Sequence, residues 1–111
     1  MKIYKIFQQD EWLFLKSNGD TDGAPIDLAD GYIHFSTAET VVETAAKYFA
    51  AVDGLMILAI ESEGLDPLKW EPSRGGALFP HLYRKLRMDD VLWAKPLPYT
   101  ENGHDFPAGI L

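Results

Sequence analysis

Alternating apolar and polar positions at the start of the chain predict a first β-strand over Lys2–Phe7. The apolar side chains that follow indicate a short helix or turn over residues 10–17, which Asn18-Gly19-Asp20 ends. Residues 21–30 are acidic and contain a glycine and a proline, so we expect a loop there. A second strand is predicted over residues 32–35.

A capping-box pattern at residues 36–39, with Ser36 and Glu39 at its ends, predicts a helix directly after this strand. Apolar residues then recur at near-helical spacing as far as Val52, and Asp53-Gly54 ends the helix. Residues 55–60 are all apolar, which is typical of a central strand covered on both faces. Shorter strands are predicted over residues 67–71, 79–83 and 91–97, the last at a sheet edge because of its prolines. Many strands with one main helix indicate an α+β fold.

Composition restricts the classes of protein to which the chain can belong. With 111 residues, of which 47% are hydrophobic, we expect a single domain over residues 1–111 with one packed core. The absence of cysteine excludes a disulfide scaffold, a thiolate nucleophile and a zinc–thiolate site, and it fits a reducing cytoplasmic location. No apolar signal region or membrane-spanning run is present, so we expect no membrane partner.

The charge is unevenly distributed along the chain. A formal net charge of −7 disfavours binding to long nucleic acids, which needs a basic face. Residues 69–95, however, contain six basic and three acidic side chains. This stretch is either an ordinary solvated face or a local attractor for a small anion. The oligomeric state is left open, and a monomer is compatible with the sequence.

The most informative segment is DGYIHFS, residues 30–36. In an extended conformation its apolar side chains face the core, while Tyr32, His34 and Ser36 line the opposite wall. His34 would then lie beside the predicted helix N-terminus, where free N–H groups favour an anion or a polarised oxygen. The alternative is structural: Ser36 is only a helix cap, and His34 bonds a backbone carbonyl.

A second segment, KWEPSRGG over residues 69–76, combines a carboxylate with a glycine-rich loop. Alternation places Trp70 in the core and Glu71 toward a cleft or partner. Arg74 and the glycines after it suit phosphate or carboxylate binding, although an ordinary surface turn is the alternative. Glu71 is our candidate for a general base or a charge-stabilising group.

The third segment is FPHLY, residues 79–83, in which Phe79, His81 and Tyr83 share one face. Polar aromatic side chains suit a pocket wall that stacks on a planar ring, or else hydrogen bonds at a sheet rim. We predict no metal site, because His34, Glu71 and His81 lack the spacing of a metal-ligand motif. Neither a GxSxG elbow nor a phosphate-binding loop motif is present.

Taken together, these motifs resemble the small bacterial family catalogued as domain of unknown function 952. IYKI at residues 3–6 precedes DGYIHFS, KWEPSRGG and FPHLY in the order of that family. The family is grouped by fold with the ADP-ribosyltransferases. This resemblance implies a compact domain with two small, mostly antiparallel sheets and one main helix around an NAD cleft.

The resemblance also implies roles at the matched positions. His34 and Ser36 would bind a ribose hydroxyl. Between them, Phe35 stands where the family pattern usually has glycine. Glu71 would stabilise an oxocarbenium-like centre or activate the acceptor. Phosphate would meet Arg74, and a ring would stack on His81, Tyr83 or Tyr48. We therefore expect binding of NAD or an ADP-ribosyl compound, with transferase or glycohydrolase activity. The alternatives are a non-catalytic nucleotide or small-anion binding module and a buried polar network that fixes the sheet.

Overall fold

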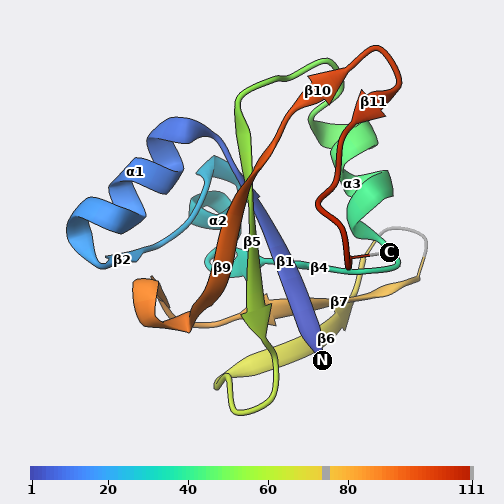
Figure 1. Ribbon diagram of the computed structural model, residues 1–111. Helices are drawn as coiled ribbons and strands as arrows, with labels where there is room; N and C mark the ends of the chain where they lie inside the picture. Colours follow the sequence, from blue (N-terminus) through green and yellow to red (C-terminus); the bar gives the residue numbers. More distant parts are fainter. Residues whose placement is uncertain (74–75, 111) are drawn as a thin grey trace.

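Short strands alternate with a few short helices along most of the chain in the computed structural model, which describes residues 1–73 and 76–110 (Figure 1). The helices are α1 (Gln9–Asn18), α2 (Pro25–Asp30), α3 (Val41–Tyr48) and the 3-10 turn η1 (Met88–Asp90). The strands are β1 (Lys2–Phe7), β2 (Asp20–Thr21), β3 (Ile33–His34), β4 (Ser36–Thr37), β5 (Leu55–Glu61), β6 (Leu68–Pro72), β7 (Leu78–Leu82), β8 (Leu86–Arg87), β9 (Val91–Leu97), β10 (Tyr99–Thr100) and β11 (Gly103–His104).

The larger sheet is antiparallel and has the strand order β4-β1-β5-β9. Strand β5 is buried along nearly its whole length, as its uninterrupted apolar sequence predicts. Leu58 faces one hydrophobic cluster and Ile57 the other, because successive side chains point to opposite faces of a strand. The predicted central strand is confirmed, and β9 lies at the sheet edge as its prolines indicate.

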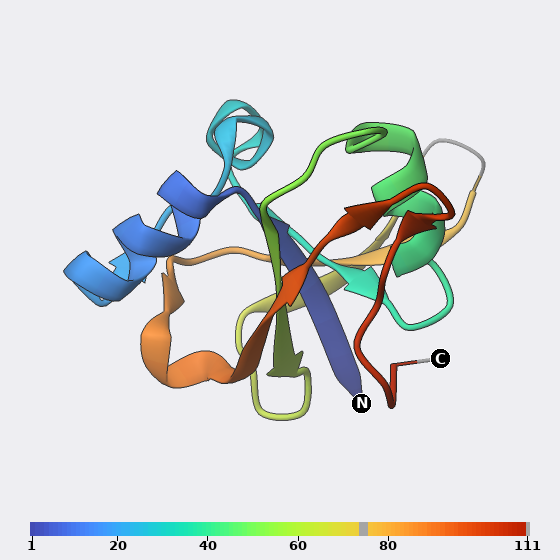
Figure 2. The same cartoon turned by 45° about the horizontal axis from the view of Figure 1, so that its top comes forward.

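Helices cover both sides of this sheet. Figure 2 shows α1 and α2 on one side of the β1, β5 and β9 ribbons and α3 on the other, beside the β10–β11 hairpin. The face toward α3 is filled by one of the two hydrophobic clusters, which includes Val41 and Ala45 of that helix. No helix in the described part of the chain combines the length and apolar character needed to cross a membrane.

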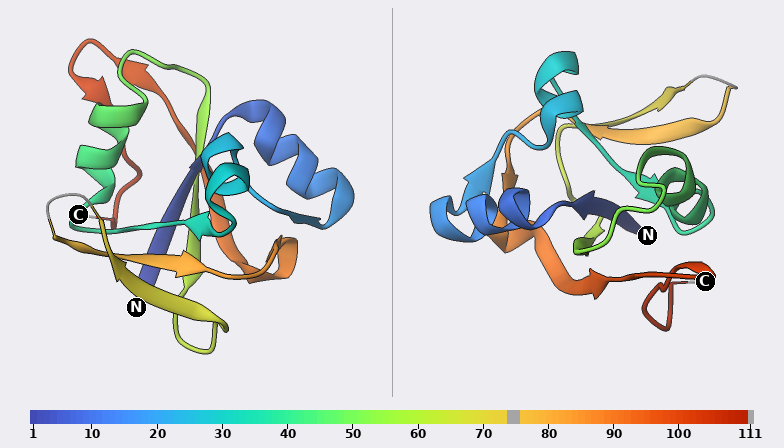
Figure 3. Two further views of the ribbon diagram at one scale, coloured as in Figure 1. Left: turned by 180° about the vertical axis from the view of Figure 1, so that it is seen from behind. Right: turned by 90° about the horizontal axis from the view of Figure 1, so that it is seen from above.

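A second antiparallel sheet, with the order β3-β7-β6, runs across the end of the larger one (Figure 1). Residues 33–37 connect the two sheets. Ile33 and His34 pair with β7, whereas Ser36 and Thr37 pair with β1 of the larger sheet. Seen from behind, this segment runs alongside β7 (Figure 3). The chain therefore changes sheets immediately after His34.

This change of sheet corrects the predicted start of the helix. Ser36 and Thr37 form strand β4, and α3 begins at Val41. Thr40 Oγ1 accepts a hydrogen bond from the Thr37 N–H at 3.0 Å. Ser36 and Thr37 pair with Tyr4 and Ile3 of β1, so strand pairing, and not helix capping, determines the conformation of residues 36–37.

The expected loop over residues 21–30 also needs correction, because it contains the short helix α2. Pro25 occupies the first turn, where a missing N–H costs nothing, and Asp27 Oδ2 accepts a bond from the Ala24 N–H at 2.7 Å. Gly31 then ends the helix in the left-handed region, with φ 84°.

Two further expectations differ from the structure. Trp70 is not a core residue, because β6 is an edge strand of the smaller sheet and leaves this side chain 40% exposed. The described residues also form more elements than two sheets and one main helix, since β2–β8 and β10–β11 add two small antiparallel pairs and α1 is longer than α3. The α+β class itself is confirmed.

Candidate functional site

Strand pairing brings two histidines of distant sequence segments together. His34 of β3 lies directly opposite His81 of β7, with ring centroids 5.1 Å apart. Tyr32 stacks on His81 at 4.3 Å with an interplanar angle of 24°, and the Tyr83 ring lies 5.0 Å from that of Tyr32. We call these four residues the aromatic cluster.

A buried carboxylate supports the His34 end of the cluster. Asp27 Oδ1 accepts a hydrogen bond from the His34 N–H at 3.0 Å and lies 2.7 Å from Nδ1 of the same residue. Its Oδ2 lies 2.7 Å from Nζ of Lys5, which is itself buried and also donates to the His34 carbonyl at 2.9 Å. One carboxylate thus orients both the backbone and the ring of His34.

The ionisation state of Asp27 follows from its hydrogen-bond and charge partners. Burial alone would raise the pKa of Asp27, but hydrogen bonds from His34 and the Lys5 ammonium outweigh it and hold the pKa below its ordinary value. Burial lowers the pKa of Lys5, which Asp27 only partly offsets. The other ring nitrogen of His34, Nε2, lies 2.9 Å from Asp30 Oδ2. Both nitrogens can donate at once only in the imidazolium form.

Glu71 supports the other end of the cluster. Its Oε1 lies 2.9 Å from His81 Nδ1 and accepts a bond from the Tyr83 hydroxyl at 2.5 Å. The bonds from Tyr83 and His81 hold the pKa of Glu71 below its ordinary value. The same bond to Glu71, with burial and the carboxylate charge, raises the pKa of Tyr83 to about 12. Lys69 lies over the Tyr83 ring, with Nζ 5.0 Å from its centroid.

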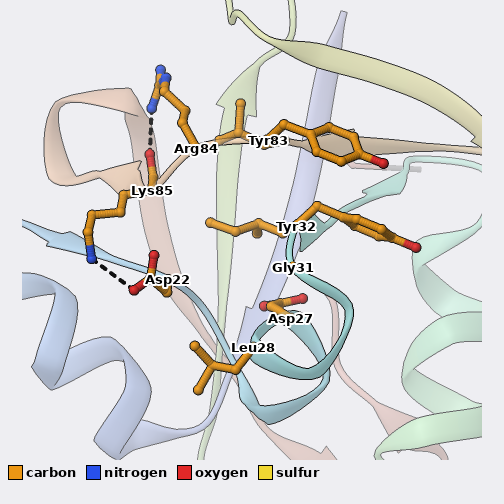
Figure 4. Close-up of a pocket in the computed structure, with 10 residues that line it drawn as sticks. Asp22, Asp27, Leu28, Gly31, Tyr32, Tyr83, Arg84 and Lys85 are labelled. Carbon is orange, nitrogen blue, oxygen red and sulfur yellow. Dashed lines mark hydrogen bonds and ion pairs between the residues drawn. The ribbon is translucent and has the colours of Figure 1, made fainter.

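A cavity of about 200 Å³ adjoins the cluster (Figure 4). In Figure 4 the side chains of Tyr32 and Tyr83 point to one side, and those of Asp22 and Lys85 lie on the other. Lys85 pairs with Asp22 at 2.9 Å. Arg84, which also lines this cavity, forms a bidentate pair with Asp90 at 2.9 and 3.1 Å.

A second cavity of about 280 Å³ lies away from the cluster, between α3 and the C-terminal hairpin. Its lining is mostly apolar and includes Val42, Tyr99 and Phe106. Tyr48, expected as one alternative for ring stacking, is 63% exposed on α3 and belongs to neither cavity lining nor the aromatic cluster.

The structure gathers most of the site residues expected from sequence. His34, Glu71, His81 and Tyr83 lie together, and Tyr32 joins them from the same segment as His34. Ser36 does not: the change of sheet buries it, and its hydroxyl donates to Thr44 Oγ1 at 3.1 Å. Arg74 lies outside the described residues. Within the described ranges, no three His, Asp or Glu side chains are arranged to hold a metal ion.

Sequence reasoning missed the buried pair of Asp27 and Lys5. Lys5 is the only charged residue among the apolar and aromatic positions from Ile3 to Phe7, which was a usable signal, because a charge in a buried strand requires a partner. Asp27 gave no comparable signal. It was one of several acidic residues in a segment expected to be a loop.

Comparison with known proteins gives relatives for nearly the whole chain. The family described as "Protein of unknown function (DUF952)" matches residues 6–94. The crystal structure of protein CC0527 from Caulobacter crescentus is similar at 47% identity and a TM-score of 0.89, covering 94% of this chain and 92% of that one. Its solution NMR structure matches at 47% identity and a TM-score of 0.83, covering 93% and 90%. No curated protein matches.

Proposed function

Because this chain belongs to the DUF952 family of proteins of unknown function, its activity must be argued from its own site, and we propose that the aromatic cluster binds NAD or an ADP-ribosyl compound. The reaction we propose is transfer or hydrolysis at the ribose carbon that carries nicotinamide. The observation that carries this proposal is the pairing of His34 and His81 against the ring of Tyr32, each histidine held by a carboxylate.

Binding energy supports the involvement of several residues together. Millimolar affinity requires about 4 kcal/mol, whereas one hydrogen bond to a charged group supplies about 1.5–3 kcal/mol. Stacking of a base on an aromatic side chain adds about 1–3 kcal/mol. Tyr83, which is 37% exposed, and the half-buried Tyr32 offer ring surface beside the polar atoms of His34 and Glu71. The cluster therefore combines both kinds of contact, and Arg74 would add a phosphate contact.

The ionisation of Glu71 favours one chemical role over another. A carboxylate whose pKa is lowered stays charged near neutral pH, so it is a weak base. It is better suited to stabilising the positive charge that develops on the ribose carbon as the glycosidic C–N bond breaks. The electron pair of that bond leaves with nicotinamide. To hold a ribose hydroxyl, His34 Nε2 would exchange its contact with the exposed Asp30 carboxylate for one with the ligand.

A second candidate is a binding module without turnover. It is favoured by the number of contacts that already hold the cluster, because both ring nitrogens of His34 face carboxylates. A module for a small anion is less well supported. Asp27, Asp30 and Glu71 surround the rings, while the nearby cations Arg84 and Lys85 are paired with Asp90 and Asp22.

The binding proposal is tested by an NMR titration of the isotope-labelled chain with NAD, ADP-ribose and nicotinamide. We expect the amide signals of Tyr32, His34 and His81 to shift at millimolar ligand, while those of Glu101 stay unchanged. If no signal of the aromatic cluster moves with any of the three ligands, the proposed function is wrong.

Turnover is tested by analysing nicotinamide release from NAD. We expect release by the wild-type chain and a loss of about 10²- to 10³-fold in Glu71→Gln, which removes the charge but keeps the side-chain shape. Glu101→Gln, an exposed carboxylate of the C-terminal hairpin, serves as the matched control. Binding without release from either the wild type or the control would favour the non-catalytic module.

A further inference from the structure

The three histidines of the chain differ in what their ring nitrogens contact. His34 has a carboxylate oxygen at each nitrogen. His104 places Nε2 2.9 Å from the Val52 carbonyl, which can only accept, so this nitrogen must carry the hydrogen. His81 has Glu71 at Nδ1 and is the case from which a chemical role follows.

Glu71 determines which nitrogen of His81 carries the hydrogen. An ionised carboxylate only accepts hydrogen bonds, and the same oxygen, Oε1, also accepts from the Tyr83 hydroxyl. The contact at 2.9 Å is therefore a bond donated by His81 Nδ1–H. In the neutral ring, Nε2 then has a lone pair and acts as an acceptor.

The Nε2 atom has no protein partner that would compete with a ligand in the described part of the chain. No protein group bonds it within residues 1–73 and 76–110, and no fully buried side-chain nitrogen or oxygen in these ranges lacks a partner. Nε2 must therefore reach the molecular surface, although His81 as a whole is only 6% exposed. The Tyr32 ring stacks on His81 at 4.3 Å and the His34 ring lies 5.1 Å away, so both rings pack against this imidazole.

We propose that His81 Nε2 is the base that takes the proton of an attacking water or alcohol hydroxyl, and that Glu71 Oε1 is the positioning group that fixes its tautomer. This inference rests on the proposed function and assigns the acceptor class as an oxygen nucleophile. As the oxygen bonds to the ribose carbon, its proton passes to Nε2 and the C–N bond breaks. The electron pair leaves with neutral nicotinamide, and the imidazolium later releases its proton to water.

Other charged or titratable groups lie around this ring. Glu71 and Lys69 come from β6, Tyr83 follows β7, and His34 and Tyr32 come from the β3 segment. Of these, only Glu71 is hydrogen-bonded to the His81 ring. Removing the acceptor oxygen of Glu71 should therefore change the tautomer of His81, whereas a change at Lys69 should not.

The tautomer is measured on the free, full chain by long-range ¹⁵N–¹H correlation of labelled histidines at about pH 8, above the usual imidazole titration. We expect protonated Nδ1 and unprotonated Nε2 in His81, with His104 as an internal control of the opposite pattern. Glu71→Gln keeps an acceptor oxygen and should retain the pattern, whereas Glu71→Ala should lose it. A protonated Nε2 in wild-type His81, or an unchanged tautomer in Glu71→Ala, would overturn the proposal whatever NAD does.

Adding NAD separates this proposal from the function on which it rests. We expect the His81 Nε2 resonance to shift with NAD, and His81→Ala to lower nicotinamide release by about 10²- to 10⁴-fold. If the Tyr32 and His34 amides shift while Nε2 does not, the binding function stands and the role of His81 is wrong. If no cluster resonance responds, the proposed function itself fails and the role of His81 fails with it.

Discussion

At the scale of single residues, Glu71 shows how one carboxylate oxygen controls two neighbours. Its Oε1 accepts bonds from His81 and Tyr83, and these bonds favour the carboxylate form of Glu71 and the protonated form of the tyrosine. The result is an acidic group and a phenol that both resist titration near neutral pH. A site built this way keeps its hydrogen-bond pattern over a wide pH range.

The ionisation of Tyr83 gives a direct test of this arrangement. We expect ¹³Cζ NMR of labelled tyrosine to give a pKa for Tyr83 of about 12 in the wild type. In Glu71→Ala the pKa should fall toward the ordinary 10.0, because both the bond and the charge that oppose ionisation are removed. Glu71→Gln should fall between the two. An equal fall in the Glu101→Gln control would show that the bond to Glu71 is not the cause.

At the scale of elements, helix α2 positions the carboxylate of Asp27. The turn before it contains Gly23 at φ 103°, a left-handed backbone conformation that favours glycine. A Cβ at this position would collide with the Asp27 carboxylate. The Gly23 N–H also donates to Thr21 Oγ1 at 3.0 Å, which ties the turn to β2. The entry to α2 and the position of its carboxylate therefore depend on one glycine.

Gly23→Ala should be destabilising, and Gly64→Ala is its matched control. Gly64 has φ 78° and nothing within 4 Å of an added Cβ, so alanine there should cost only the left-handed penalty of about 1–2 kcal/mol. Gly23→Ala should cost about 1–3 kcal/mol more, because Asp27 must move. Urea unfolding measures both values. Equal losses, or an unchanged His34 amide signal in Gly23→Ala, would contradict this view of α2.

At the scale of the whole molecule, the pair of Asp27 and Lys5 joins the two sheets. Lys5 belongs to β1 of the larger sheet, and Asp27 bonds His34 in β3 of the smaller sheet. Both side chains are buried, so removal of one partner leaves the other charge without compensation. The site is thereby coupled to the stability of the core.

Asp27→Asn should lower the free energy of unfolding by about 3–5 kcal/mol, because the Lys5 ammonium stays buried. The control is Asp22→Asn at the exposed pair with Lys85, where about 1 kcal/mol or less is expected. Urea unfolding at neutral pH measures both. A loss at position 27 no larger than that at position 22 would contradict the proposed coupling.

The pH dependence has a definite sign. The pKa of Asp27 is lower in the folded chain than its ordinary value of 3.8, so its contribution is complete above 3.8 and is lost as pH falls through the folded pKa. The wild type should therefore lose more stability than Asp27→Asn below about pH 4. If the free energies of unfolding of the two chains fell by the same amount across that pH range, Asp27 would not be linked to folding.

The sequence was sufficient where a local pattern and the tertiary structure agree. The apolar run of β5 predicted a strand with two covered faces. The alternation in DGYIHFS placed Tyr32 and His34 on one face, and that in FPHLY placed His81 and Tyr83 on one face; the structure brings these side chains together. It failed at Ser36, where a helix-capping pattern competed with pairing to β1, and at Trp70, whose exposure depends on the edge position of β6. Both failures concern which strand lies next to which.

By itself, then, the sequence determined the α+β class, the buried central strand and the residue types of the site, because these follow from periodicities of a few residues. Only the tertiary structure decided that His34 faces His81, that Glu71 holds Nδ1 of His81, and that Asp27 and Lys5 form a buried pair. The physical reason is that such contacts join residues far apart in the chain. They depend on strand register, where a shift of one residue turns every side chain to the opposite face.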